Sequence, residues 1–222
     1  MALTFATALG FGPINHLLHV TCAQASTSTI GYLINTEAMG PTYGGKLRIP
    51  LGLREAPPHF EEASGTYAVS DSSWARRPRP YGGHVVMRMN GPVLWSARQF
   101  KTCVPDSSAE AETAEASRAT KSLMFVKAVC CAARMPAMGV SALLIDNSAT
   151  TEHVKKEGPS QKVRHFERPT MLVKWAVLRL LIALHLVSTD YMIADLFTKA
   201  VDKDTFQRLR NVIRTMSRWT AA

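Results

Sequence analysis

Two short apolar runs, each ending in an aspartate, constrain this chain more than any other feature. Residues 66–71 read TYAVSD and residues 142–146 read ALLID. In a strand alternate side chains share a face, so Asp71 and Asp146 would point the same way as the apolar residues two and four positions before them. A carboxylate at the end of a buried strand is costly to desolvate unless a cation meets it. The simplest shared partner of two such strand ends is a divalent metal ion with oxygen ligands.

Composition narrows the class of protein. The chain has 222 residues, of which 46% are hydrophobic, so it can bury a core and a wholly disordered protein is excluded. Its net charge of +9 favours a polyanionic partner, either nucleic acid or an acidic membrane surface. No apolar run reaches the ~18 residues of a membrane span. The spacing of the four cysteines matches no zinc site, so we expect reduced thiols. Reduced thiols predict an intracellular protein, either cytoplasmic or nuclear.

The order of the expected elements predicts an α/β domain with a mixed sheet. Three strands come first, and Asn90-Gly91 between two of them is a hairpin signal. Helices and strands then alternate. The strands are expected at 66–71, 83–89, 93–97, 142–146 and 183–187, and the helices at 107–134, 147–156, 167–181, 191–200 and from Asp204 onwards.

We divide the chain into four parts on this basis. Residues 1–40 carry no motif and have no assigned role, and residues 41–65 are rich in Gly and Pro and form a connector. The α/β domain covers residues 66–200. Residues 201–222 form a basic C-terminal helix.

Four acids are candidate metal ligands and catalytic residues: Asp71, Glu110, Asp146 and Asp195. Glu110 lies in the first turn of one expected helix, and Asp195 lies near the start of another. Ligands of open α/β sheets collect at the carboxyl ends of strands where the strand order reverses. Two Mg²⁺ ions about 3.5–4 Å apart would neutralise four acids there and support in-line phosphodiester cleavage. The alternatives are turn formers at strand ends and acids that complement helix dipoles.

Several short segments between about residues 66 and 216 carry motifs, each of them weak alone. The segments are 70–75 (SDSSWA), 91–102 around LWS and RQFKT, 107–112 (SSAEAE), 146–149 (DNSA), 187–200 (VSTD then IADLFTKA) and 206–210 (FQRLR). Together and in this order they resemble the ribonuclease H domain of copia-type (Ty1/copia) retrotransposon polyproteins. The corresponding family motifs are S-D-x-D-W-A, P-I-S-W-x-S-K-K-Q-x-T, S-S-T-E-A-E, D-N-Q-S-A, V-P-T-x-x-x-x-A-D-I-L-T-K-A and the family's closing helix.

This resemblance implies a ribonuclease H-like fold, with a mixed five-stranded sheet of antiparallel hairpin strands and parallel strands flanked by helices. It implies that the four acids hold Mg²⁺, with Mn²⁺ as a substitute, and that the chain hydrolyses RNA paired to DNA during reverse transcription. The implied partners are an RNA–DNA hybrid or other nucleic acid and, within a polyprotein, an upstream reverse transcriptase polypeptide, with no membrane.

Basic residues could line a groove for the phosphate backbone, a contact that does not depend on sequence. A solvated basic surface is the alternative. The candidates are Arg76, Arg77, Arg79, Lys162, Arg164 and His165.

Two other functions stay open. One is a catalytically inactive nucleic-acid-binding or structural remnant of a retrotransposon polyprotein. The other is a DNA strand-transfer enzyme on the same fold, which needs a differently spaced acidic triad and usually an upstream zinc module, and this sequence has no such His/Cys cluster.

Overall fold

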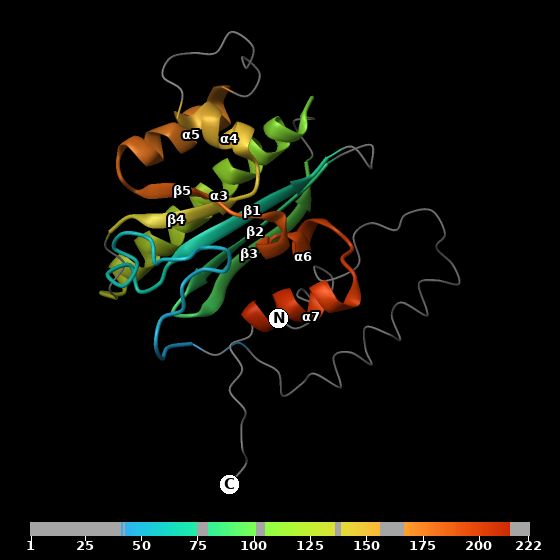
Figure 1. The fold of residues 1–222 in the computed structure, drawn as a ribbon. Coiled ribbons are helices and arrows are strands. Elements are labelled where there is room, and N and C mark those ends of the chain that lie inside the picture. Colours follow the sequence, from blue (N-terminus) through green and yellow to red (C-terminus); the bar gives the residue numbers. More distant parts are fainter. Residues whose placement is uncertain are drawn as a thin grey trace.

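The computed structural model describes residues 41, 43–74, 80–100, 105–135, 139–155 and 167–213. Its centre is a five-stranded mixed sheet with the strand order β3-β2-β1-β4-β5 (Figure 1). This confirms the predicted α/β class and the mixed sheet. The strands are β1 (Tyr67–Ser73), β2 (Tyr81–Arg88), β3 (Gly91–Gln99), β4 (Ser141–Ile145) and β5 (Ile182–Leu186).

The first three strands form an antiparallel meander, and the last two add parallel strands on the other side of β1. In the β2–β3 hairpin Arg88 pairs with Gly91, so the two loop residues are Met89 and Asn90, both with positive φ (47° and 69°). The turn therefore begins one residue earlier than the Asn90-Gly91 pair predicts. An added Cβ at Gly91 would clash with the ring of Tyr43, so this exposed side chain would have to shift.

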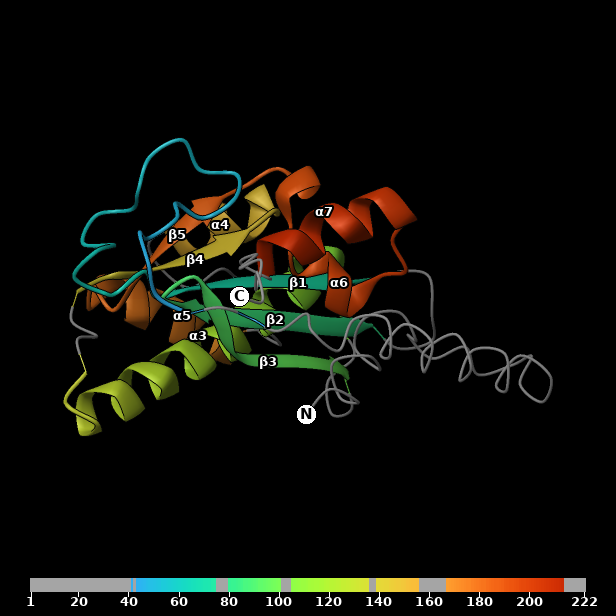
Figure 2. The same cartoon turned by 90° about the horizontal axis from the view of Figure 1, so that it is seen from below.

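Helices cover both faces of the sheet, with α6 and α7 on one face and α3 on the other (Figures 1 and 2). None of the helices in the described ranges combines the length and apolarity needed to cross a membrane. The helices are α3 (Ser108–Ala132), α4 (Ser148–Lys155), α5 (Glu167–Leu178), the 3₁₀ helix η2 (Thr189–Tyr191), α6 (Asp195–Thr198) and α7 (Lys203–Ile213).

Alternation along the strands divides the core into two clusters. Val69 and Leu144 face α6 and α7, whereas Ala68 and Leu143 face α3 and α5. Asp71 has the parity of Val69, and Ser72 has the parity of Ala68. Neighbouring residues near the end of β1 therefore point to opposite faces of the sheet.

The longest helix, α3, begins with a side-chain cap. The Ser107 hydroxyl accepts a hydrogen bond from the Glu110 backbone N–H (3.3 Å), as the Ser/Glu spacing predicts. The Glu110 carboxylate accepts in turn from the backbone N–H of Asp106 (2.6 Å). Glu110 thus stabilises the start of the helix.

Candidate metal centre

Strand register brings Asp71 and Asp146 together. β1 and β4 are parallel, with Tyr67 opposite Ala142 and Val69 opposite Leu144. Asp71 lies two residues after Val69, and Asp146 lies two residues after Leu144, directly after the last residue of β4. The chain leaves β1 toward β2 on one side and returns through α3 to β4 on the other, so the strand order reverses between β1 and β4. Open α/β sheets bind ligands at the carboxyl ends of the strands on either side of such a reversal.

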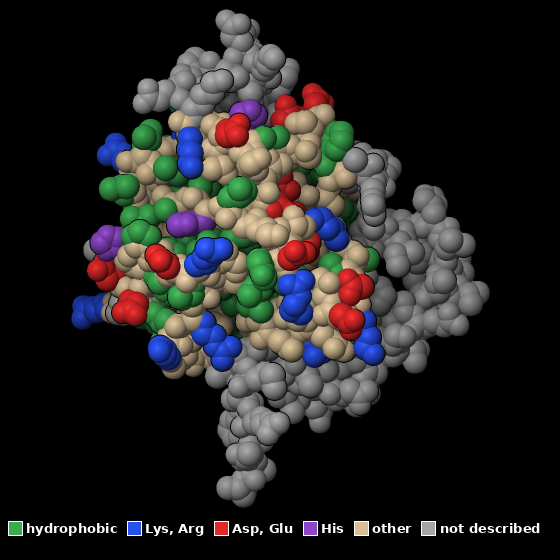
Figure 3. All heavy atoms as spheres, in the orientation of Figure 1, with side chains coloured by type: hydrophobic (Ala, Val, Ile, Leu, Met, Phe, Trp, Pro, Cys, Tyr) green, Lys and Arg blue, Asp and Glu red, His purple; other side chains and the backbone are tan. Residues whose placement is uncertain are grey.

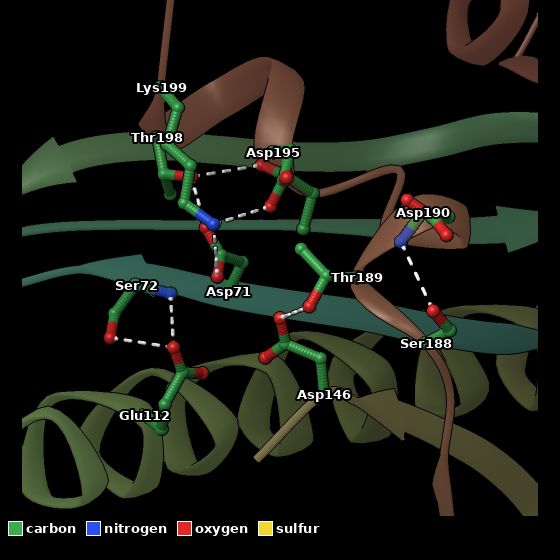
Figure 4. A network of polar contacts seen from close by, with 11 residues as sticks. Asp71, Ser72, Glu112, Asp146, Ser188, Thr189, Asp190, Asp195, Thr198 and Lys199 are labelled. Atoms are coloured by element: carbon green, nitrogen blue, oxygen red, sulfur yellow. Dashed lines mark hydrogen bonds and ion pairs between the residues drawn. The ribbon is translucent and has the colours of Figure 1, made fainter. Parts of the chain in front are cut away.

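The third acid of the group is Glu112, from α3. One carboxylate oxygen from each of Asp71, Glu112 and Asp146 lies within 4.8 Å of the other two. Ser72 orients Glu112, because its backbone N–H (2.9 Å) and its hydroxyl (3.0 Å) both donate to Oε1 of that carboxylate (Figure 4). Within the described part of the chain, the buried Oε2 of Glu112 has no hydrogen-bond partner.

Glu112, not the predicted Glu110, therefore lies beside Asp71 and Asp146. The two glutamates are two positions apart, which is about 200° around a helix, so they project from opposite sides of α3. Helical periodicity could have separated them. Glu112 is 11 positions before the buried Leu123, a displacement of only about 20° around the axis, whereas Glu110 falls on the far side.

Asp195, the first residue of α6, lies on the other side of Asp71. Its Oδ1 accepts a hydrogen bond from the Lys199 ammonium (2.9 Å), and the same ammonium is 3.4 Å from Oδ1 of Asp71 (Figure 4). The Thr198 hydroxyl also donates to Asp71. At the end of the neighbouring strand β4, the Thr189 hydroxyl donates to Oδ2 of Asp146 (3.0 Å). The sequence prediction missed Lys199 and both threonines as parts of this network.

Burial and mutual repulsion disfavour the ionised forms of Glu112, Asp146 and Asp195 and raise their pKa values. Burial, and then the charges of Asp71 and Asp146, raise the pKa of Glu112 well above its usual value. Burial and the nearby Asp71 raise the pKa of Asp146, and the same two causes raise that of Asp195 to about 7. Burial alone would lower the pKa of Lys199, but Asp71 and Asp195 outweigh it and raise that pKa, so the ammonium stays charged.

The three-acid group fits a hard divalent cation. Its donors are all carboxylate oxygens, the ligand type that Mg²⁺, Mn²⁺ and Ca²⁺ prefer. The free Oε2 of Glu112 offers a buried acceptor without another partner among the described residues. A bound cation would also relieve the repulsion that raises the pKa values of Glu112 and Asp146.

The six basic residues predicted to contact nucleic acid lie outside the described residues. These are Arg76, Arg77, Arg79, Lys162, Arg164 and His165. On the described surface seen in Figure 3, basic and acidic side chains are interspersed. A phosphate-binding groove formed by the six residues therefore stays a prediction.

No family model and no curated protein sequence matches this chain. Among solved structures, it is similar to the N-terminal RNase H domain of a Mycobacterium tuberculosis protein, with 12% identity over 65% of this chain and 94% of that one (TM-score 0.45). It is also similar to RNase H1 from Halobacterium salinarum, with 13% identity over 60% and 93% of the two chains (TM-score 0.45). A third is LC11-RNase H1 in complex with an RNA/DNA hybrid, with 12% identity over 60% and 93% (TM-score 0.44). These are similarities of overall fold, and they assign no role to any residue of this chain.

Proposed function

We propose that this protein is a metal-dependent ribonuclease H-type endonuclease that hydrolyses the RNA strand of RNA–DNA hybrids. The observation that carries the proposal is the convergence of Asp71, Glu112 and Asp146 from three separate elements at the carboxyl ends of β1 and β4. The ordered motif segments along residues 66–216 support a more specific origin, the copia-type retrotransposon polyprotein.

In the proposed mechanism, Asp71, Glu112 and Asp146 would hold the divalent metal, which would supply Lewis-acid activation of water and of the phosphodiester when bound. Ser72 and Thr189 fix the orientation of two of these carboxylates through the hydrogen bonds described above. Such hydrogen bonds are needed because the carboxylates must already be held close to the geometry in which they bind the metal. On the side of Asp71 away from Glu112, the Lys199 ammonium pairs with Asp71 and Asp195 and offsets part of their negative charge.

We propose that recognition of the hybrid depends on its shape, its 2′-hydroxyl groups and its phosphates rather than on base sequence. The net charge of +9 supports a polyanionic substrate. Residues 66–200 would form the catalytic domain, with an upstream reverse transcriptase polypeptide as the partner and an intracellular site of action.

A cleavage assay tests this proposal. The full chain is incubated with an end-labelled RNA–DNA hybrid in Mg²⁺, with single-stranded RNA and duplex DNA as control substrates. We expect endonucleolytic RNA fragments from the hybrid alone, and none in EDTA. Asp146→Asn should lower the rate by more than about 100-fold, because even residues that only support a metal ligand are worth about 10–100-fold.

A matched pair of variants on α3 tests the site itself. Glu112→Gln keeps the shape of the side chain but removes a charged ligand, so we expect a loss like that of Asp146→Asn. Glu110→Gln lies two positions away and keeps an oxygen that can accept from the Asp106 N–H, so it should cleave at nearly the wild-type rate. The reverse result would refute the proposed site. Hybrid binding without any cleavage by the wild type would favour an inactive nucleic-acid-binding remnant.

A further inference from the structure

Lys199 lies inside the acidic centre rather than beside it. Its ammonium is between the Oδ1 atoms of Asp195 (2.9 Å) and Asp71 (3.4 Å), as the dashed lines of Figure 4 show. The Asp71 side chain is 1% exposed and that of Asp195 is 10% exposed, whereas Lys199 reaches them from the surface with 37% of its side chain exposed. This ion pair is therefore largely shielded from water, and salt screens it less than a surface pair.

The acids of the centre, with Glu112 in place of the predicted Glu110, fall into a group of three and a single residue. Asp71, Glu112 and Asp146 have oxygens close enough together to share one ion, and Asp195 is not in that group. Asp195 instead directs Oδ1 at the lysine. An ion that bridged Asp71 and Asp195 would need oxygens at about 2.0–2.1 Å for Mg²⁺. The ammonium already holds one oxygen from each of these two residues, so such an ion would have to displace it.

Charge is compatible with this arrangement. With the carboxyls of Asp71, Glu112, Asp146 and Asp195 ionised, the centre carries four negative charges, and Lys199 supplies one positive charge. One divalent ion in the three-acid group then leaves a net charge of −1, and a second divalent ion beside Lys199 would change it to +1. The position of Lys199, rather than the net charge, therefore argues against a second ion.

We infer that the protein binds one divalent cation, on Asp71, Glu112 and Asp146, and that the Lys199 ammonium takes the place of a second cation between Asp71 and Asp195. This inference rests on the metal site of the proposed function. It differs from the sequence-based expectation of two Mg²⁺ ions held by four acids. Lys199 is then a positioning residue, which holds Asp71 and Asp195 through its charge.

Mn²⁺ binding to the full chain, without nucleic acid, tests the inference. Free Mn²⁺ is measured by electron paramagnetic resonance during a titration, and Asp71→Asn gives the background from ions bound elsewhere. We expect one ion per wild-type chain above this background. In Lys199→Met we expect a second ion to bind, at least tenfold more tightly than a second ion binds to the wild type. Lys199→Arg keeps the positive charge, and Lys203→Met removes an exposed lysine of α7, so both should still bind one ion.

Two ions bound by the wild type with similar affinity, and the same number in Lys199→Met, would overturn the inference. If Lys199→Met does not fold, Asp195→Asn gives a second measurement. It should leave the count at one ion with affinity changed less than tenfold, whereas a larger loss would make Asp195 a metal ligand and refute the assignment.

The count of bound ions is independent of cleavage. A chain that binds one ion and cleaves no hybrid would contradict the proposed function alone. A chain that cleaves hybrid and binds two ions would contradict this inference alone.

Discussion

Replacing Asp195 by asparagine should remove a defined part of the pH dependence of stability. Burial, together with the charge of Asp71, raises the pKa of Asp195 from 3.8 to about 7 in the folded protein. Between these two values the folded protein holds a proton that the unfolded chain has lost. The free energy of unfolding must therefore fall as the pH rises through this range. An asparagine side chain cannot titrate, so the Asp195→Asn variant lacks this contribution.

The size of the effect follows from the two pKa values. Below pH 3.8 the contribution is fully present, and it is lost once the pH exceeds 7. Between pH 5 and pH 8, linkage gives a loss of about 2.5 kcal/mol in the free energy of unfolding from Asp195 alone. Glu112 and Asp146 also have raised pKa values, so they act in the same direction and their part remains in the variant. Against a typical total of about 5–15 kcal/mol this difference is readily measured.

Urea unfolding in EDTA at pH 5 and pH 8 provides the assay. The wild type should lose about 2–3 kcal/mol more than Asp195→Asn between these two conditions. Asp190→Asn, which alters an exposed aspartate of η2, is the matched control and should behave like the wild type. Saturating Mg²⁺ at pH 8 should restore stability in the wild type, because the metal binds only the folded, deprotonated site. An equal pH dependence in the wild type and in Asp195→Asn would refute this reasoning.

Two further substitutions test how the centre is supported. Glu115→Gln should lower the free energy of unfolding by about 3–5 kcal/mol in urea, because the buried carboxylate pairs with His84 Nδ1 (2.6 Å) and Arg118 (3.1 Å), and its loss leaves these partners uncompensated. A loss below about 1 kcal/mol would show that the network contributes little. Gly83→Ala would place a Cβ 2.5 Å from the Cβ of Phe197 and push α6 away from the sheet. We expect about 1–3 kcal/mol of destabilisation and slower hybrid cleavage, and unchanged values of both would contradict the close packing.

Local pattern was sufficient for most of the scaffold. The apolar runs before Asp71 and Asp146 became the strands β1 and β4, and the capped, Ala-rich run became α3. Both depend on interactions between residues close in sequence, such as alternation in a strand and a side-chain cap. The predicted helix at 191–200 proved shorter, as η2 followed by α6. The helix expected from Asp204 onwards begins at Lys203, and Asp202 caps it by accepting from the N–H groups of both Asp204 and Thr205.

The sequence by itself determined the mixed sheet and the two strand-end aspartates, because the first follows from the order of the elements and the second from the period of the side chains along each strand. Only the tertiary structure decided which acid of α3 joins them and how Asp195 is used. The period of α3 places Glu112, and not Glu110, on the side of the buried Leu123, but only the packing of α3 on β1 brings Glu112 to Ser72 and leaves Glu110 at the helix start. Lys199 and Asp71 are 128 residues apart, so their contact exists only because α6 packs against β1 and β2. Long-range packing, not local preference, therefore sets the charge balance of the centre.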